Sequence, residues 1–200
     1  MPQRRRSHRR PPKTRRAKRL FVLACEGRNA EPRYFRRFSE SDSAVSVKCL
    51  PVAGKSPERL LRKLRRNVDD NPLSPNDEAW MVVDRDQWSP SELDRLSSWI
   101  QSEQQYGLAL SNPSFEYWLL LHFEDGYGIN SARDCMHRLK RHIPHYDKSV
   151  DRMDCTQDQI RQAISRAKAL DVHRAEDWPK KPGITTVYRL AEKLVADSTW

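Results

Sequence analysis

The amino-acid sequence predicts an α/β fold in which helices flank a mostly parallel central sheet, followed by a helical C-terminal part. Two continuous apolar runs, at 20–25 and 79–83, support this prediction, because strands buried on both faces of a parallel sheet lack polar alternation. Amphipathic helical stretches and shorter strand-like segments alternate with these runs along the chain. Such alternation is typical of a doubly wound sheet.

The first part of the chain supplies two predicted strands and two predicted helices. The run 20–25 is followed by a helix that starts near Glu31 and carries aromatic residues at helical spacing. Residues 44–52 alternate apolar and polar side chains, which predicts the second strand. Ser56 is then expected to cap a helix with Pro57 in its first turn, and the apolar stripe of this helix comprises Leu60, Leu61, Leu64 and Val68.

The middle of the chain continues the alternation. After the strand 79–83, the segment Ser89–Glu92 has the sequence of a capping box, which predicts the start of another helix. Residues 106–110 predict a further strand. Asn112 is then expected to cap an apolar helix over 115–123.

The last third of the chain is predicted to be helical. Apolar residues at helical spacing indicate helices over 132–141, 157–170 and 185–195. The charged segment 142–154 between the first two is interpreted as a surface loop. Residues 19–200 are therefore expected to form one α/β domain with C-terminal helices.

The positive charge of the chain is concentrated at its start. Residues 1–19 contain ten Lys or Arg and no acid, which leaves 27 of the 37 basic residues against 27 acidic ones in the rest of the chain. We expect residues 1–18 to be a disordered basic tail, which either improves solubility or binds phosphates without sequence preference.

The sequence also bounds the cellular location. No apolar segment is long enough to span a membrane, and the basic start is not followed by the apolar core of a signal peptide. The four cysteines occur singly, and no CxxC pair indicates a zinc or redox site. The simplest expectation is a cytoplasmic protein that keeps its thiols reduced and does not bind membranes.

Three carboxylates follow predicted strands. Glu26 comes directly after the first apolar run, and Asp84 and Asp86 come after the second. Ligands of open α/β sheets bind beyond the carboxyl ends of the strands, and two residues spaced by two point the same way in an extended segment. Carboxylates gathered there repel one another unless a cation lies among them, and Mg²⁺ prefers such oxygens. The alternative is that these acids form turns and helix caps.

The same residues carry a resemblance to a known domain. Glu26-Gly27 after the first strand, and Asp84-Arg85-Asp86 after the third, resemble the two Toprim motifs of topoisomerases, primases and nucleases. The resemblance implies a Toprim-like (Rossmann-like) fold. It also implies acid/base work by Glu26 and metal binding by Asp84 and Asp86.

A longer resemblance covers nearly the whole body of the chain. The segments Cys25–Gly27 and Val83–Asp86, together with Ser111–Phe123 (SNPSFEYWLLLHF), are similar to the RloB-like family. The resemblance implies an effector of bacterial anti-phage defence that acts on RNA, tRNA or DNA and is associated with an ABC- or AAA-type ATPase. The oligomeric state is left open, a homo-oligomer included.

We therefore predict an Mg²⁺- or Mn²⁺-dependent endonuclease in which Glu26, Asp84 and Asp86 are catalytic and bind the metal. One alternative is a catalytically silent module that docks on a partner ATPase or on nucleic acid. A nucleotidyl transferase is disfavoured, because no zinc motif or larger partner domain accompanies the site. Further candidates for supporting the site or binding substrate are Glu31, Glu116, Arg28, Arg85, His122 and Lys148. Each also has an ordinary structural alternative, such as a helix cap, an ion pair, a core histidine or a solvated lysine.

Overall fold

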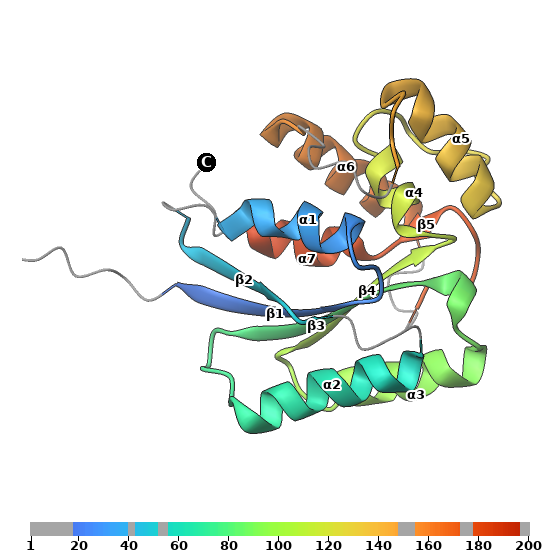
Figure 1. Ribbon diagram of the computed structural model, residues 1–200. Coiled ribbons are helices and arrows are strands. Elements are labelled where there is room, and N and C mark those ends of the chain that lie inside the picture. The colour runs from blue at the N-terminus through green and yellow to red at the C-terminus, as the bar shows by residue number, and fades with distance from the viewer. Residues whose placement is uncertain (1–17, 40–42, 52–55, 148–154, 173–177, 197–200) are drawn as a thin grey trace, which may run out of the picture.

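A single five-stranded sheet organises the protein. The computed structural model describes residues 18–39, 43–51, 56–147, 155–172 and 178–196 (Figure 1). The first four strands are parallel and the short fifth strand is antiparallel to its neighbour, in the order β2-β1-β3-β4-β5. The strands are β1 (Arg19–Cys25), β2 (Val45–Cys49), β3 (Glu78–Asp84), β4 (Tyr106–Asn112) and β5 (Ile184–Thr185).

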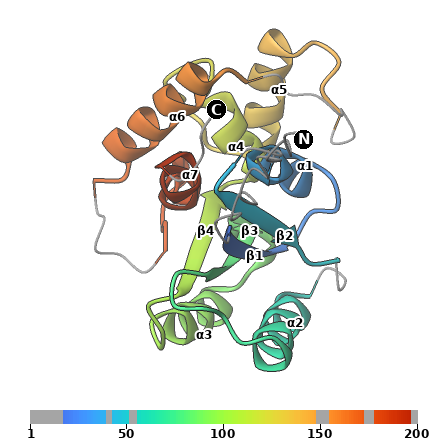
Figure 2. The same cartoon turned by 90° about the vertical axis from the view of Figure 1, so that its left-hand side faces the viewer.

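Helices cover both faces of this sheet. One face carries α2 (Pro57–Asp70) and α3 (Pro90–Ile100), and the other carries the remaining helices (Figures 1 and 2). These are α1 (Ala30–Arg36), α4 (Phe115–Leu120), α5 (Ala132–His142), α6 (Gln157–Leu170) and α7 (Val187–Ala196). Within the described ranges, no helix combines the length and the apolar character needed to cross a bilayer.

The sheet separates two hydrophobic cores, which explains the continuous apolar runs of the sequence. Along β1, Val22 and Ala24 pack with α2 and α3, whereas Phe21, Leu23 and Cys25 belong to the core on the opposite side. A strand that alternates its side chains between two buried layers has no solvent-facing position for a polar residue. The predicted α/β class with a mostly parallel sheet is thus confirmed.

The order in which the strands are added to the sheet changes between β1 and β3. These strands are neighbours, yet β1 continues into α1 on one face and β3 continues into α3 on the other (Figure 1). The two connections diverge and leave a crevice beyond the carboxyl ends of the strands. Open α/β sheets bind ligands at such a topological switch point.

Several local predictions are confirmed. The capping box at Ser89 and Glu92 forms at the start of α3, with both reciprocal hydrogen bonds present. The helix predicted over 157–170 has those bounds. Ser56 precedes α2 as predicted, but its side chain makes no capping hydrogen bond.

Three local predictions are wrong. Asn112 does not cap the following helix, because it is the last residue of β4 and pairs with Ile184 of β5, so that Ser114 precedes α4. The helix predicted from Thr185 begins at Val187, because Ile184 and Thr185 form β5. The segment after Asp84 is a short 3₁₀ turn over Arg85–Gln87 rather than an extended strand.

Two predicted segments fall largely outside the described residues. The predicted basic tail, 1–18, is described only at residue 18, and the predicted surface loop 142–154 is described only to residue 147. Within that loop Tyr146 is buried rather than exposed, with 5% of its surface accessible. This part of the segment therefore belongs to the packed body of the domain.

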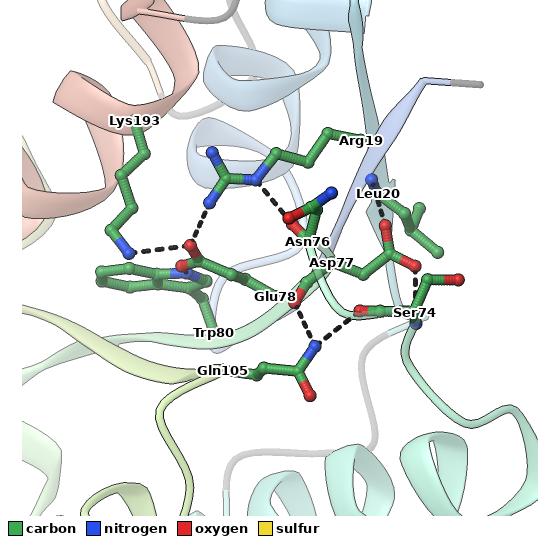
Figure 3. Close-up of polar contacts among 9 residues, drawn as sticks. All are labelled: Arg19, Leu20, Ser74, Asn76, Asp77, Glu78, Trp80, Gln105 and Lys193. Atoms are coloured by element: carbon green, nitrogen blue, oxygen red, sulfur yellow. Dashed lines mark hydrogen bonds and ion pairs between the residues drawn. The ribbon is translucent and has the colours of Figure 1, made fainter. Parts of the chain in front are cut away.

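A buried carboxylate joins the amino ends of the strands to the last helix (Figure 3). Glu78, at the start of β3, accepts hydrogen bonds from Arg19, from Lys193 of α7 at 2.7 Å and from the Trp80 indole at 2.8 Å. Two cations and an indole N–H thus compensate the cost of burying one charge. This cluster lies at the edge of the sheet opposite to the crevice, so its role is structural.

Candidate active site

The crevice beyond β1 and β3 contains a pocket of about 310 Å³ that is rich in carboxylates. Acids from the loop after β1, from α1, from the end of β3 and from α4 meet there. The lining residues are Glu26, Gly27, Arg28, Asn29, Ala30, Glu31, Asp84, Asp86, Phe115 and Glu116. The structure thus brings together the three acids proposed as catalytic and three of the six further candidates.

Glu26 is held between the two strands that define the switch point. Its Oε2 accepts a hydrogen bond from the backbone N–H of Asp84 at 3.3 Å and another from the Trp88 indole at 3.0 Å. Two donors on one oxygen fix the orientation of the side chain. Trp88 was not identified from the sequence, because nothing in its surroundings indicates that the chain turns back toward residue 26.

Glu31 is buried beside Glu26. Its carboxylate accepts a hydrogen bond from the Gly27 backbone N–H at 3.1 Å. A Cβ atom at position 27 would overlap with the Glu31 carboxylate. Gly27 is therefore needed for space, because it lets a charged side chain pack directly on the backbone after β1.

Asp84 has the most perturbed carboxyl group of the pocket. Burial is the largest cause that raises its pKa well above the usual range, and the nearby charges of Glu31, Glu116, Glu26 and Asp86 raise it further. Asp86 is exposed at the rim, one 3₁₀ turn away. A crowd of like charges around a partly buried acid is costly in the absence of a cation.

Glu116 completes the pocket from the side of α4 and is buried. Its carboxylate accepts hydrogen bonds from the Ser114 hydroxyl at 2.8 Å and, at the longer distance of 3.4 Å, from the Tyr146 hydroxyl. Tyr146 was missed from the sequence, where it lies in an irregular charged segment. Its contact joins parts of the chain 30 residues apart, and no local pattern signals such a contact.

Comparison with known families identifies the group to which this chain belongs. A family model described as RloB-like protein matches residues 21–194, which contain every residue that lines the pocket. The chain belongs to the RloB-like family. Searches of curated proteins and of solved structures found no match.

The two arginines of this RloB-like site have different surroundings. Arg28 is exposed and lines the pocket after β1. Arg85 instead donates to the Trp88 carbonyl oxygen, and its guanidinium lies 5.0 Å from the centre of the Trp178 ring. Arg85 therefore packs beside the pocket, whereas Arg28 is an exposed residue of the pocket lining.

Of the remaining two candidates, His122 is not brought to the pocket. His122 is buried among aromatic side chains, with Nδ1 at 3.0 Å from the Trp118 carbonyl oxygen and Nε2 at 3.0 Å from the Tyr34 hydroxyl. Burial lowers its pKa to about 3, which leaves the ring neutral at physiological pH. Lys148 lies outside the described residues.

The chemistry of the donors suits a hard divalent cation. The pocket offers carboxylate oxygens without thiol or imidazole ligands, the set that Mg²⁺ and Mn²⁺ prefer. Among the described residues, no group of three His, Cys, Asp or Glu side chains is already placed to hold a metal. The pocket fits such an ion in charge and donor type, and rotation of the side chains is required to bring three oxygens onto it.

Proposed function

We propose that this RloB-like protein is a metal-dependent nuclease that hydrolyses phosphodiester bonds of RNA, tRNA or DNA as an effector of bacterial anti-phage defence. The observation that carries the proposal is the gathering of four further carboxylates around Asp84 at the switch point of the sheet. Binding of Mg²⁺ or Mn²⁺ would relieve the repulsion that, after burial, raises the pKa of Asp84.

In this proposal Glu26, Asp84 and Asp86 hold the ion. When bound, the ion supplies Lewis-acid stabilisation of the phosphate charge and lowers the pKa of a water molecule. Glu26 acts as general base for the attacking water, because its hydrogen bonds to Trp88 and to the Asp84 backbone keep one face of its carboxylate in a fixed direction. As Glu26 takes the proton, the water oxygen bonds to phosphorus and the bond from phosphorus to the leaving oxygen breaks. The leaving oxygen then takes up a proton, returned by Glu26 or supplied by solvent.

The other residues of the pocket support these roles. Glu31 and Glu116, each held by neutral donors, add negative charge that increases the affinity for a cation. Arg28 at the rim contacts a substrate phosphate and orients it toward the carboxylates.

A cleavage assay tests the proposal. The purified protein is incubated with total tRNA and with plasmid DNA, in Mg²⁺, in Mn²⁺ and in EDTA. Cleavage is expected with metal and should be abolished in Asp84→Asn and Glu26→Gln. Asp69→Asn is the matched control, because it removes an exposed carboxylate from α2 on the other face of the sheet. Equal cleavage by Asp84→Asn and Asp69→Asn would rule out this mechanism.

The second candidate is a silent binding module that docks on nucleic acid or on the partner ATPase implied by the family resemblance. It is favoured by the hydrogen bonds that Glu26, Glu31 and Glu116 already accept from protein donors, which hold the pocket together without an ion. Thermal unfolding separates the two candidates. A metal-binding site is stabilised by Mg²⁺ or Mn²⁺, whereas a silent module melts at the same temperature with and without metal.

A further inference from the structure

One face of α5 forms a basic stripe, defined by Arg133, His137, Lys140 and Arg141. All four side chains are exposed. At 3.6 residues per turn, they fall within an arc of about 100° around the helix. The opposite side of α5 carries the buried residues Cys135 and Leu139. The four basic side chains therefore form one continuous exposed face of the helix.

The stability of the helix does not account for this stripe. Lys140 and Arg141 lie in the last turn, where cations complement the helix dipole, but Arg133 lies in the first turn, where a cation opposes it. None of the stripe residues pairs with an acid in the described part of the chain, whereas Arg138 of the same helix pairs with Glu124. The stripe is thus available for an external anion.

The helix that carries the stripe packs on an element of the carboxylate pocket. Helix α5 packs on the outer side of α4, which carries Glu116 (Figure 1). Shortly after α5 ends, Tyr146 contacts Glu116 directly. The segment that follows the C-terminal end of the stripe thus reaches the site.

An exposed aromatic residue stands beside α5. Tyr127 leaves 69% of its surface accessible, and Val172 is the other large apolar side chain exposed to that degree in the described ranges. The Arg138 side chain donates to the Tyr127 carbonyl oxygen, which places Tyr127 alongside α5. Basic grooves combined with aromatic side chains are the usual means of holding single-stranded nucleic acids, because an unpaired base stacks on the ring.

We propose that the stripe and Tyr127 bind a single-stranded polynucleotide, with the stripe on its phosphates and Tyr127 stacked on a base, and lead it to the pocket. This inference rests on the proposed nuclease function and names its substrate class. Residues four apart on a helix are about 6 Å apart along its axis, a spacing comparable to that of successive phosphates in an extended strand. A polynucleotide is favoured over an acidic protein partner, because the stripe itself contains no apolar side chain and a single exposed tyrosine suits a stacked base.

A binding experiment without metal tests this surface. The affinity of a short fluorescein-labelled single-stranded RNA is measured by anisotropy in EDTA, for the full chain and for R133Q/K140Q/R141Q. The matched control, R59Q/R62Q/R66Q, removes the same charge from exposed positions of α2 on the other face of the sheet. The basic residues of 1–19 are present in all three proteins, so their contribution cancels.

The α5 variant is expected to bind roughly tenfold or more weakly at about 0.1 M salt, and the slope of log affinity against log salt should fall by about 2 for three lost phosphate contacts. The α2 control should change little. Tyr127→Ala is expected to weaken single-stranded binding by about fivefold or more. It should leave binding of a duplex of the same sequence unchanged. Melting curves of each variant establish that the fold is intact.

Equal losses in the α5 and α2 variants would overturn the proposal, because net charge alone would then explain binding. It would also be overturned if the α5 variant kept its affinity for RNA but lost affinity for polyglutamate, since the stripe would then serve an acidic protein. Failure of the nuclease proposal is a separate outcome. In that case the unchanged protein does not cleave RNA in Mg²⁺ or Mn²⁺, although the α5 effect in EDTA persists.

Discussion

Replacing Asp84 by Asn tests the electrostatic account of the pocket, because it removes one charge and keeps the shape of the side chain. In the folded protein, burial and then the charges of Glu31, Glu116 and Glu26 raise the pKa of Asp84 well above its usual range. In the unfolded chain the carboxyl group titrates near its ordinary value of about 3.9. Folding of the metal-free protein therefore disfavours the ionised form of this group.

The sign of the effect on stability follows from proton binding. Between the ordinary and the raised pKa, the folded protein holds a proton that the unfolded chain has released. The free energy of unfolding therefore falls as pH rises through this window, by up to about 1.4 kcal/mol per pH unit for one group. The penalty is absent below the unfolded pKa and complete above the folded pKa. Asn does not titrate, so the variant should lose this slope and gain stability at high pH.

Urea unfolding in EDTA, from about pH 4 to about pH 8, measures the difference. Subtracting the curve of Asp84→Asn from that of the unchanged protein cancels the titrating groups outside the pocket, such as His122, whose pKa is lowered by burial to about 3. The pocket acids that interact with Asp84 contribute to the difference together with Asp84 itself. Asp69→Asn should give a curve parallel to that of the unchanged protein, because this carboxylate is exposed. A difference between the Asp84→Asn and unchanged proteins that stays constant across the whole range would refute the reasoning.

Three further predictions follow from other parts of the structure. Saturating Mg²⁺ or Mn²⁺, at about 100 times its dissociation constant, should stabilise the unchanged protein by about 2.7 kcal/mol, or roughly 5–10 °C in Tm, and should not stabilise Asp84→Asn; calorimetry measures this. Gly27→Ala should force the Glu31 carboxylate away from the pocket. Cleavage of nucleic acid should then drop sharply, while the free energy of unfolding falls by only about 1 kcal/mol. An unchanged cleavage rate would show that the position of Glu31 is unimportant. Glu78→Gln should weaken the buried ion cluster and lower the free energy of unfolding by about 1.5–3 kcal/mol in urea titrations, without changing cleavage at temperatures where the protein is folded, since Glu78 lies at the opposite edge of the sheet.

Much of the secondary structure could be predicted because it depends on local patterns. The apolar run at 20–25 became a central strand buried on both faces, and Ser89 with Glu92 formed the capping box that its spacing indicates. The failures occurred where a distant segment competed for the backbone. Asn112 resembles a helix cap in sequence, but Ile184 of β5 pairs with it and extends the strand.

Some features of the candidate site could likewise be predicted from local patterns, and others depend on distant segments. The positions of Glu26 and Asp84 at the ends of adjacent parallel strands follow from the sequence, because each acid directly ends an apolar run and parallel strands end at one edge. The direction of Arg85, in contrast, depends on Trp178, far away in the chain. No property of residues 84–86 alone indicates that this guanidinium packs on an indole.

The sequence by itself determined the class of the fold, the alternation of its apolar faces and the identity of the acids at the strand ends. Each of these depends on residues that are close together in the chain. Only the tertiary structure decided which side chains share the pocket. Glu116 reaches Asp84 because α4 packs above the end of the sheet, Tyr146 reaches Glu116 across a long connection, and His122 turns into the aromatic core. Packing between distant segments sets these contacts, and a local sequence pattern does not determine how distant segments pack.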